Sequence, residues 1–174
     1  MLNSHDLTTW STVVSNTMPV TGLAFGGKFV AGRADGTFLT SSNGSAWSNP
    51  WADPVTLDYF YDFEFLNSMF LGLGYDRLSF SPDGARWTNV VLATNTGPLL
   101  SITYGKGLYV AGGEYRTVWI SADGVNWTNP APGLSVQPYV ADVVTAYGNG
   151  VFVGASGYAG DILTSSDGTN WTVQ

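Results

Sequence analysis

The stretch SSDGTNWT, from Ser165 to Thr172, is the last of five versions of one phrase along this chain. The earlier versions are SADGVNWT at 121–128, SPDGARWT at 81–88, SSNGSAWS at 41–48 and SHDLTTWS at 4–11. Their tryptophans are 37, 40, 40 and 44 residues apart along the sequence. A repeat of this length is typical of a β-propeller, in which each repeat supplies one four-stranded blade.

The segments between the phrases alternate short β-rich runs with turns. Before each of the last four phrases, an aromatic residue, a Gly-rich or polar turn and an apolar run predict a two-stranded hairpin. These hairpins read AFGGKFVAG (24–32), EFLNSMFLGLG (64–74), TYGKGLYVAGG (103–113) and AYGNGVFVGAS (146–156). A third strand follows in TFLTSS (37–42), RLSFS (77–81), TVWIS (117–121) and DILTSS (161–166). The phrase then turns the chain, and its Trp opens a fourth strand.

The sequence therefore predicts an all-β fold, a small β-propeller without helices of amphipathic period. Four blades of four antiparallel strands are expected at about 19–50, 56–91, 98–130 and 138–174, within a single domain spanning 1–174. The fifth phrase leaves a spare fourth-strand element at 1–14, an extra N-terminal strand. It can pack beside the last blade, replace its outer strand or pair with another copy, because proteins normally cover an edge strand.

The pattern S-x-D-G-x-x-W has the composition of a tight turn. The Asp side chain accepts hydrogen bonds from the backbone N–H groups that follow it, and Gly supplies a positive φ without steric cost. The Trp packs between sheets and can donate its indole N–H to a carbonyl. A scaffold role is the favoured interpretation, and a ring of Asp and Trp side chains that holds sugars is the alternative. The residues of this structural turn motif are Ser4, Asp6, Trp10, Asn43, Gly44, Trp47, Asp83, Gly84, Trp87, Asp123, Gly124, Trp127, Asp167, Gly168 and Trp171.

The phrase resembles the Asp-box of sialidase-type (BNR) β-propellers of bacterial and phage proteins, whose pattern is S-x-D-x-G-x-x-W. It departs from that pattern by one residue, because Gly follows Asp directly. The resemblance implies that the phrase joins the third and fourth strands of a blade, away from any catalytic face. It covers nearly the whole chain at the level of repeats and implies little about function.

A sialidase-like activity is not expected. By the same resemblance, such an enzyme would need three arginines for a carboxylate, a Tyr–Glu nucleophile pair, an acid Asp and about six blades. The chain has four arginines, of which Arg86 lies inside a phrase and Arg33, Arg77 and Arg116 recur at related places in the repeat. Its single histidine, His5, makes neither a His-rich metal site nor a well-placed catalytic triad. The chain is therefore predicted not to be an enzyme.

The overall charge restricts the partners. The net charge is −7 with only six Lys plus Arg, so neither nucleic acid nor an anionic lipid surface is an expected partner. No apolar stretch is long enough to insert into a membrane, and the N-terminus lacks the pattern of a Sec signal peptide. There is no cysteine. A virion or an extracellular surface reached without a Sec signal is the favoured location.

One segment, 49–65, breaks the repeat with NPWADPVTLDYFYDFEF. Strand alternation predicts that Asp58, Asp62 and Glu64 share one face with Phe60 on the innermost strand of the second blade. Three acids on one face suggest a Ca²⁺ site at the central channel, because Ca²⁺ is bound by several oxygen ligands. The favoured alternative is that these acids are solvated at a rim and that the protein has no cofactor. Four-bladed hemopexin-like propellers, which this blade count resembles, often hold channel ions.

The same segment supplies the candidate ligand or partner residues Trp51, Tyr59 and Tyr61, since exposed aromatic side chains stack on sugars or form protein hot spots. The first functional hypothesis is a structural or interaction module. It would be an accessory surface component of a larger assembly such as a phage particle, of the decoration or tail type, with self-association through the N-terminal strand. The alternative is a multivalent lectin. A glycosidase using Asp58 or Asp62 is the least favoured.

Overall fold

A computed structural model describes residues 1–4, 6–12, 18–49, 59–92, 97–130, 142–157 and 160–174. Their regular structure is β-strand, apart from one short 3₁₀ turn at Glu114–Arg116. In these residues no helix is long and apolar enough to cross a membrane.

Four antiparallel sheets follow one another along the chain, each with its strands in sequence order. The first contains β3 (Val20–Phe25), β4 (Phe29–Arg33) and β5 (Phe38–Ser41). The second contains β6 (Asp62–Leu66), β7 (Met69–Leu73), β8 (Arg77–Ser81) and β9 (Thr88–Val91). The third contains β10 (Leu99–Gly105), β11 (Leu108–Gly113) and β12 (Val118–Ser121), and the fourth β13 (Val143–Gly148), β14 (Val151–Ser156), β15 (Ile162–Ser165) and β16 (Thr172–Val173). The predicted all-β propeller architecture is confirmed.

The expectation of four full strands in every blade is wrong for the first and third blades. Among the described residues, their fourth strands are limited to single bridged pairs, Thr40 with Ser48 and Ile120 with Thr128. Two residues after each bridge the sequence has a proline, Pro50 or Pro130, where the second blade has Val90. Proline has no N–H to donate, so the ladder cannot continue through that position.

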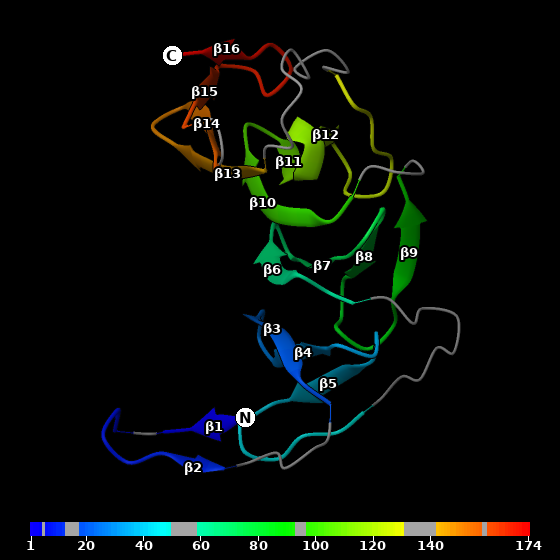
Figure 1. Cartoon of the computed structure of the whole chain (residues 1–174). Helices are drawn as coiled ribbons and strands as arrows, with labels where there is room; N and C mark the ends of the chain where they lie inside the picture. Colours follow the sequence, from blue (N-terminus) through cyan, green and yellow to red (C-terminus); the bar gives the residue numbers. More distant parts are fainter. Residues whose placement is uncertain (5, 13–17, 50–58, 93–96, 131–141, 158–159) are drawn as a thin grey trace.

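The four blades are arranged in an open arc (Figure 1). The first strand of each sheet lies along the inner side, and β3 contacts β6, β6 contacts β10, and β10 contacts β13. Among the described residues, no strand of the first blade packs against a strand of the fourth. The blades therefore do not close into a ring within the described part of the chain, and both ends of the stack present a sheet face.

The hydrophobic core is divided into three clusters, one at each blade-to-blade contact. At the first contact, the ring of Phe63 lies against the backbone of Gly22 and Gly32, and a Cβ on Gly22 would be 2.8 Å from its Cδ2 atom. Larger side chains at these glycines would therefore push the second blade away. Burial between blades, not within one sheet, holds the arc together.

The N-terminal residues form a small hairpin at one end of the arc (Figure 1). Its strands are β1 (Leu2–Asn3) and β2 (Ser11–Thr12), joined by the first phrase. The spare strand thus pairs with β1, and the last blade has its own outer strand β16. The Asn3 side-chain amide donates hydrogen bonds to the Gly44 carbonyl (2.9 Å) and the Ser45 hydroxyl (3.2 Å), which attach the hairpin to the first blade.

Candidate interaction surfaces

All five phrases form the same hydrogen-bonded turn. In the third blade, the Ser121 hydroxyl accepts from the N–H of Gly124 at 2.8 Å. The Asp123 carboxylate accepts from the N–H groups of Val125 (2.9 Å) and Asn126 (2.8 Å). The same bonds recur around Ser4, Ser41, Ser81 and Ser165. The polar groups of the phrase are thus directed at its own backbone.

Two phrases depart in sequence and keep the geometry. Asn43 accepts with its amide oxygen from the N–H groups of Ser45 and Ala46, both at 2.9 Å. Leu7 adopts φ 61°, in the region that glycines occupy in the other four phrases. A side chain with a Cβ is strained there. Hydrogen bonds from backbone N–H groups lower the pKa of the four phrase aspartates, Asp6, Asp83, Asp123 and Asp167.

The phrase tryptophans are not equivalent. Trp47, Trp127 and Trp171 donate their indole N–H to the carbonyl of the phrase glycine, each at 3.0 Å. Trp87 is instead only 7% exposed and packs in the core between the first two blades, whereas Trp10 is 55% exposed. The phrases therefore do not present a repeated set of equally exposed indoles.

The acidic stretch is arranged differently from the prediction. Phe60 is buried in the same cluster as Phe63, so the expected alternation, which put Phe60 on the face of the acids, is wrong between these residues. The packing of both rings against the first blade overrides the strand period. Asp62 and Glu64 are half-buried, and burial raises the pKa of both carboxyls, helped for Glu64 by the charge of Asp62.

The calcium site stays a prediction. Asp58 and Trp51 lie outside the described residues. Within those residues no group of three His, Cys, Asp or Glu side chains is placed to hold a metal, so Asp62 and Glu64 would need a further ligand. Neither lines one of the pockets described below, and the glycosidase hypothesis stays untested.

Four exposed tyrosines gather where the second and third blades meet, and we call them the tyrosine surface. They are Tyr59 (48% exposed), Tyr61 (38%), Tyr75 (47%) and Tyr115 (48%). The rings of Tyr59 and Tyr61 meet edge to face, with centroids 5.1 Å apart. Burial raises the pKa of Tyr61, and the nearby charge of Glu114 and the hydroxyls of Tyr59 and Tyr75 add to the effect.

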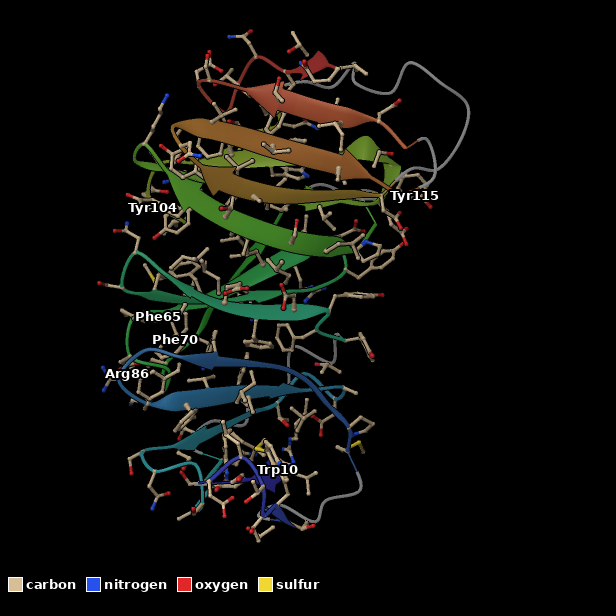
Figure 2. All side chains as sticks on the ribbon, turned by 90° about the vertical axis from the view of Figure 1, so that its left-hand side faces the viewer. Trp10, Phe65, Phe70, Arg86, Tyr104 and Tyr115 are labelled. Carbon is tan, nitrogen blue, oxygen red and sulfur yellow. The ribbon has the colours of Figure 1, made fainter. Side chains whose placement is uncertain are left out.

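Tyr115 joins this surface through the turn after β11. A Cβ on Gly97 would lie 2.9 Å from the Tyr115 ring and 3.0 Å from Glu114. The next residue, Pro98, forms a β-bridge with Tyr75, which brings Tyr75 to the same place. Tyr115 has φ 56° and ψ 28°, an unfavourable conformation for a tyrosine. Figure 2 places it at the opposite edge of the blades from Tyr104 and Phe65.

Sequence reasoning found Tyr59 and Tyr61 but missed the other two. A signal was present, because the loop after the second strand reads GYDR at 74–77, GEYR at 113–116 and GYAG at 157–160. A tyrosine thus recurs in the same loop of three blades.

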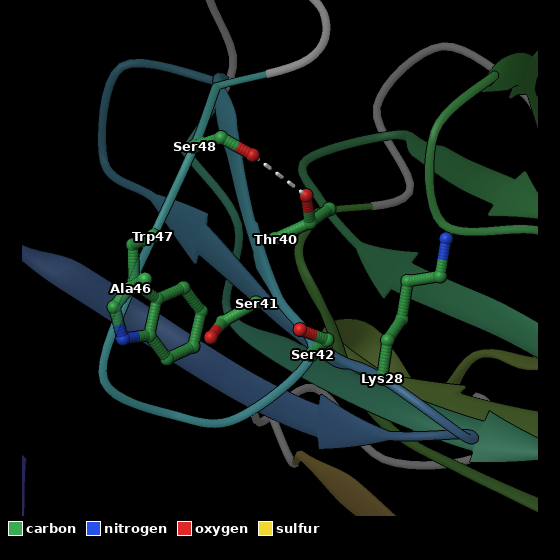
Figure 3. A pocket seen from close by; sticks show the side chains of 7 residues that line it. All are labelled: Lys28, Thr40, Ser41, Ser42, Ala46, Trp47 and Ser48. Atoms are coloured by element: carbon green, nitrogen blue, oxygen red, sulfur yellow. Dashed lines mark hydrogen bonds between the residues drawn. The ribbon is translucent and has the colours of Figure 1, made fainter.

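A separate open pocket of about 380 Å³ lies on the first blade (Figure 3). It is lined by Lys28, Thr40, Ser41, Ser42, Ala46, Trp47 and Ser48. Figure 3 shows the Lys28 side chain on one side of the pocket and the Trp47 indole on the other. The hydroxyls of Thr40 and Ser48 lie between them and are 3.4 Å apart. At the ladder position of Thr40 the next two blades have Phe80 and Ile120, whereas the fourth blade has Thr164, whose hydroxyl lies 3.3 Å from that of Thr172.

Comparison with known proteins identifies the fold. No protein-family model matches the chain. No curated protein matches it in sequence. Among solved structures it is similar to β-propellers. For YCF48 from Cyanidioschyzon merolae the TM-score is 0.64 at 14% identity, over 95% of this chain and 59% of that one. For YCF48 bound to D1 peptide the TM-score is 0.67 at 16% identity, over 95% of this chain and 57% of that one.

Two computationally designed proteins are similar in the same way. The Ika4 protein aligns with a TM-score of 0.62 at 14% identity, over 88% of this chain and 94% of that one. The Ika8 protein aligns with a TM-score of 0.64 at 15% identity, over 86% of this chain and 46% of that one. The chain therefore spans less than two thirds of YCF48 and less than half of Ika8.

Proposed function

We propose that this chain is a non-catalytic β-propeller module that binds a protein partner through the tyrosine surface. The observation that carries the proposal is the grouping of four exposed tyrosines, from three separate segments, around Glu114. Tyrosine offers a large and rigid contact area and loses little conformational entropy when bound, which is why it is enriched at binding hot spots. The strained backbone at Tyr115 is in keeping with a residue positioned for contact.

The expected partner segment carries a basic side chain. Glu114 lies beside Tyr61, and the chain as a whole has a net charge of −7. An arginine or lysine could lie over a tyrosine ring and contact the Glu114 carboxylate at the same time. An acidic or strictly apolar partner would lack the second contact.

The solved structures support a peptide as the first probe. YCF48 is described as bound to D1 peptide, so a propeller of similar fold holds a peptide. At 16% identity the similarity concerns the fold alone, and the partner of this chain has to be identified by experiment.

The wider setting we propose is that of an accessory surface component of a larger assembly such as a phage particle. Its support comes from the sequence. The chain carries the Asp-box-like phrase, and only 11% of its residues are charged. The protein would need no cofactor, with Ca²⁺ at Asp58, Asp62 and Glu64 as the one candidate ion.

Carbohydrate binding is the second candidate, favoured by the pocket beside Trp47. An indole face, four hydroxyl side chains and the Lys28 ammonium are groups that hold sugars. A multivalent lectin would need the same opening in every blade, whereas Phe80 and Ile120 replace Thr40 in the next two. The fourth blade repeats the hydroxyl pair as Thr164 and Thr172, so sugar sites would be limited to the first and fourth blades.

Selection of a random peptide library on the immobilised protein tests the proposal. We expect enriched peptides that contain Arg or Lys and lose at least about tenfold in affinity with Tyr61→Ala, the scale of a hot-spot side chain. Trp10→Ala removes an exposed aromatic residue elsewhere and should have no effect. If the peptides bind Tyr61→Ala and Tyr115→Ala as tightly as they bind the wild type, the tyrosine surface is not the binding site. A glycan array on the same sample, with Trp47→Ala as the variant, tests the second candidate.

A further inference from the structure

The two ends of the arc have matching apolar faces, of which the fourth-blade face is open and the first-blade face is partly covered by the N-terminal hairpin. We propose that the outer face of the fourth blade binds the first-blade end of a second copy, so that two copies continue the blade stack into a closed ring. The contact would lie at the ends of the stack. The tyrosine surface lies on loops between the second and third blades, so the two proposals can fail independently.

The outer face of the fourth blade has the character of a buried contact. Val118 of the third blade is fully buried against the fourth blade, and Ile162 takes the same place in the ladder of the fourth blade but is 44% exposed. Val110 is likewise buried, whereas its counterpart Val153 is half-exposed. Val144 adds a further apolar side chain, 48% exposed, on the same face.

The opposite end lacks the partner that every other blade has. Leu23 on β3 is 51% exposed, although Phe63 and Ile102 at the same ladder position are buried against the preceding blade. Phe25 is 57% exposed, while its counterpart Tyr147 packs on the third blade. A second copy's fourth blade would cover both side chains with the kind of contact that already joins the blades in this chain.

The N-terminal hairpin occupies only part of this end. It lies against the outer region of the first blade, and a cavity of about 210 Å³ remains between them, lined by Leu23, Phe29, Trp10 and Trp47 among others. Its β1, phrase and β2 repeat the outer two strands of a blade, the place that β15 and β16 of a second copy would take. The hairpin is therefore an incomplete cap that competes with the second copy.

The number of copies follows from the length of the arc. A head-to-tail contact gives a ring when its rotation closes and a filament when it does not. The four blades align with 46% of the designed Ika8 propeller, so two copies supply about the amount of chain present in that structure. A dimer is the expected assembly.

Native mass spectrometry over a hundredfold range of concentration, about the range that resolves a dissociation constant, tests this assembly with the full chain. We expect a dimer for the wild type. Both Val144→Asp, on the fourth blade, and Phe25→Asp, on the first, should weaken it at least about tenfold, because each would bury an unpaired charge. Val91→Asp, at an exposed valine on the outer strand β9, is the matched control and should remain a dimer.

Mixing the two defective variants tests the head-to-tail arrangement. Val144→Asp retains a good first-blade end and Phe25→Asp a good fourth-blade end, so the mixture should form a mixed dimer through one intact contact. Asn3→Ala removes the hydrogen bonds of the hairpin to Gly44 and Ser45, so this variant should dimerise more tightly than the wild type. Monomers for both the wild type and Asn3→Ala, or open-ended polymers, would overturn the proposal, with thermal unfolding confirming that each variant is folded.

Discussion

The indole ring of Trp87 lies flat against the ring of Phe38, with centroids 3.9 Å apart and planes 1° apart. Phe38 belongs to β5 of the first blade, and Trp87 immediately precedes β9 of the second, so this stack joins two blades. The phrase tryptophans of the other three blades donate their indole N–H to a phrase carbonyl. The buried Nε1 of Trp87 has no hydrogen-bond partner among the described residues, so its contribution is made by packing.

Replacing Trp87 should therefore test packing separately from hydrogen bonding. Trp87→Ala is expected to lower the free energy of unfolding by about 3–5 kcal/mol, the usual cost of removing a large buried aromatic side chain. Trp87→Phe should cost much less, because a ring remains on Phe38 and no buried N–H is left unpaired. Urea denaturation gives both values. A Trp127→Ala variant with a loss as large as that of Trp87→Ala would contradict this ranking, since Trp127 is only half-buried.

Leu7 provides a site where a smaller residue should stabilise. Its φ of 61° is strained for leucine, and its side chain is 80% exposed, so little packing is lost on its removal. Leu7→Gly should stabilise the N-terminal hairpin by about 1 kcal/mol. Hydrogen exchange at the amides of Thr8 and Thr9, which bond to Asp6, reports the change locally.

The matched control for this change is Leu7→Ala, which removes the same side chain but keeps the Cβ and therefore the strain. Equal protection in both variants would show that the backbone conformation is not the cause. A stiffer hairpin is also a better competitor for the first-blade end, so Leu7→Gly should weaken the dimer proposed above.

The phrase aspartates make stability depend on acid pH. Hydrogen bonds from backbone N–H groups hold the pKa of Asp83, Asp123 and Asp167 below the ordinary 3.8. A group whose pKa is lowered by folding adds stability above its unfolded pKa and loses it as the pH falls toward its folded pKa. Thermal unfolding temperatures should therefore decrease below about pH 4.

Asparagine should remove this dependence, because Asn43 makes the same bonds without a titrating group. The double variant Asp123→Asn, Asp167→Asn is expected to unfold near the wild-type temperature at neutral pH and to lose less on acidification. A wild-type profile that stays flat down to about pH 2 would exclude the aspartates as its source.

Much of the fold was predictable because the phrase is local. The turn depends only on neighbouring residues such as Ser121, Asp123 and Gly124, so its five copies predicted the strand order and the fourfold repetition. The shortened outer strands of the first and third blades were also readable, from Pro50 and Pro130. Alternation failed at Phe60, because contact with the first blade decides which way that ring points.

The open ends and the tyrosine surface could not be read in the same way. Both depend on how blades lie beside one another, and no local pattern states whether a stack closes. The repeat also suggested one environment for all phrase tryptophans, yet Trp87 turned into the core and Trp10 into solvent. Tyr75 and Tyr115 of the proposed surface lie in loops, where only the recurrence of a tyrosine in the same loop pointed to them.

Asp62 and Glu64 should change stability in the sense opposite to the phrase aspartates. Burial raises the pKa of both carboxyls above their ordinary values of 3.8 and 4.5. A group whose pKa is raised by folding destabilises the protein at higher pH, and this penalty disappears as the pH falls below the unfolded pKa. Glu64→Gln should therefore raise the unfolding temperature at neutral pH and have no such effect near pH 4, where the wild-type carboxyl is already largely protonated.

Thermal unfolding at both pH values separates the two cases, and adding Ca²⁺ separates a metal site from simple burial. Stabilisation of the wild type by Ca²⁺ that is lost in Glu64→Gln would identify these acids as ligands, whereas no response to Ca²⁺ would leave burial as the cause of the raised pKa.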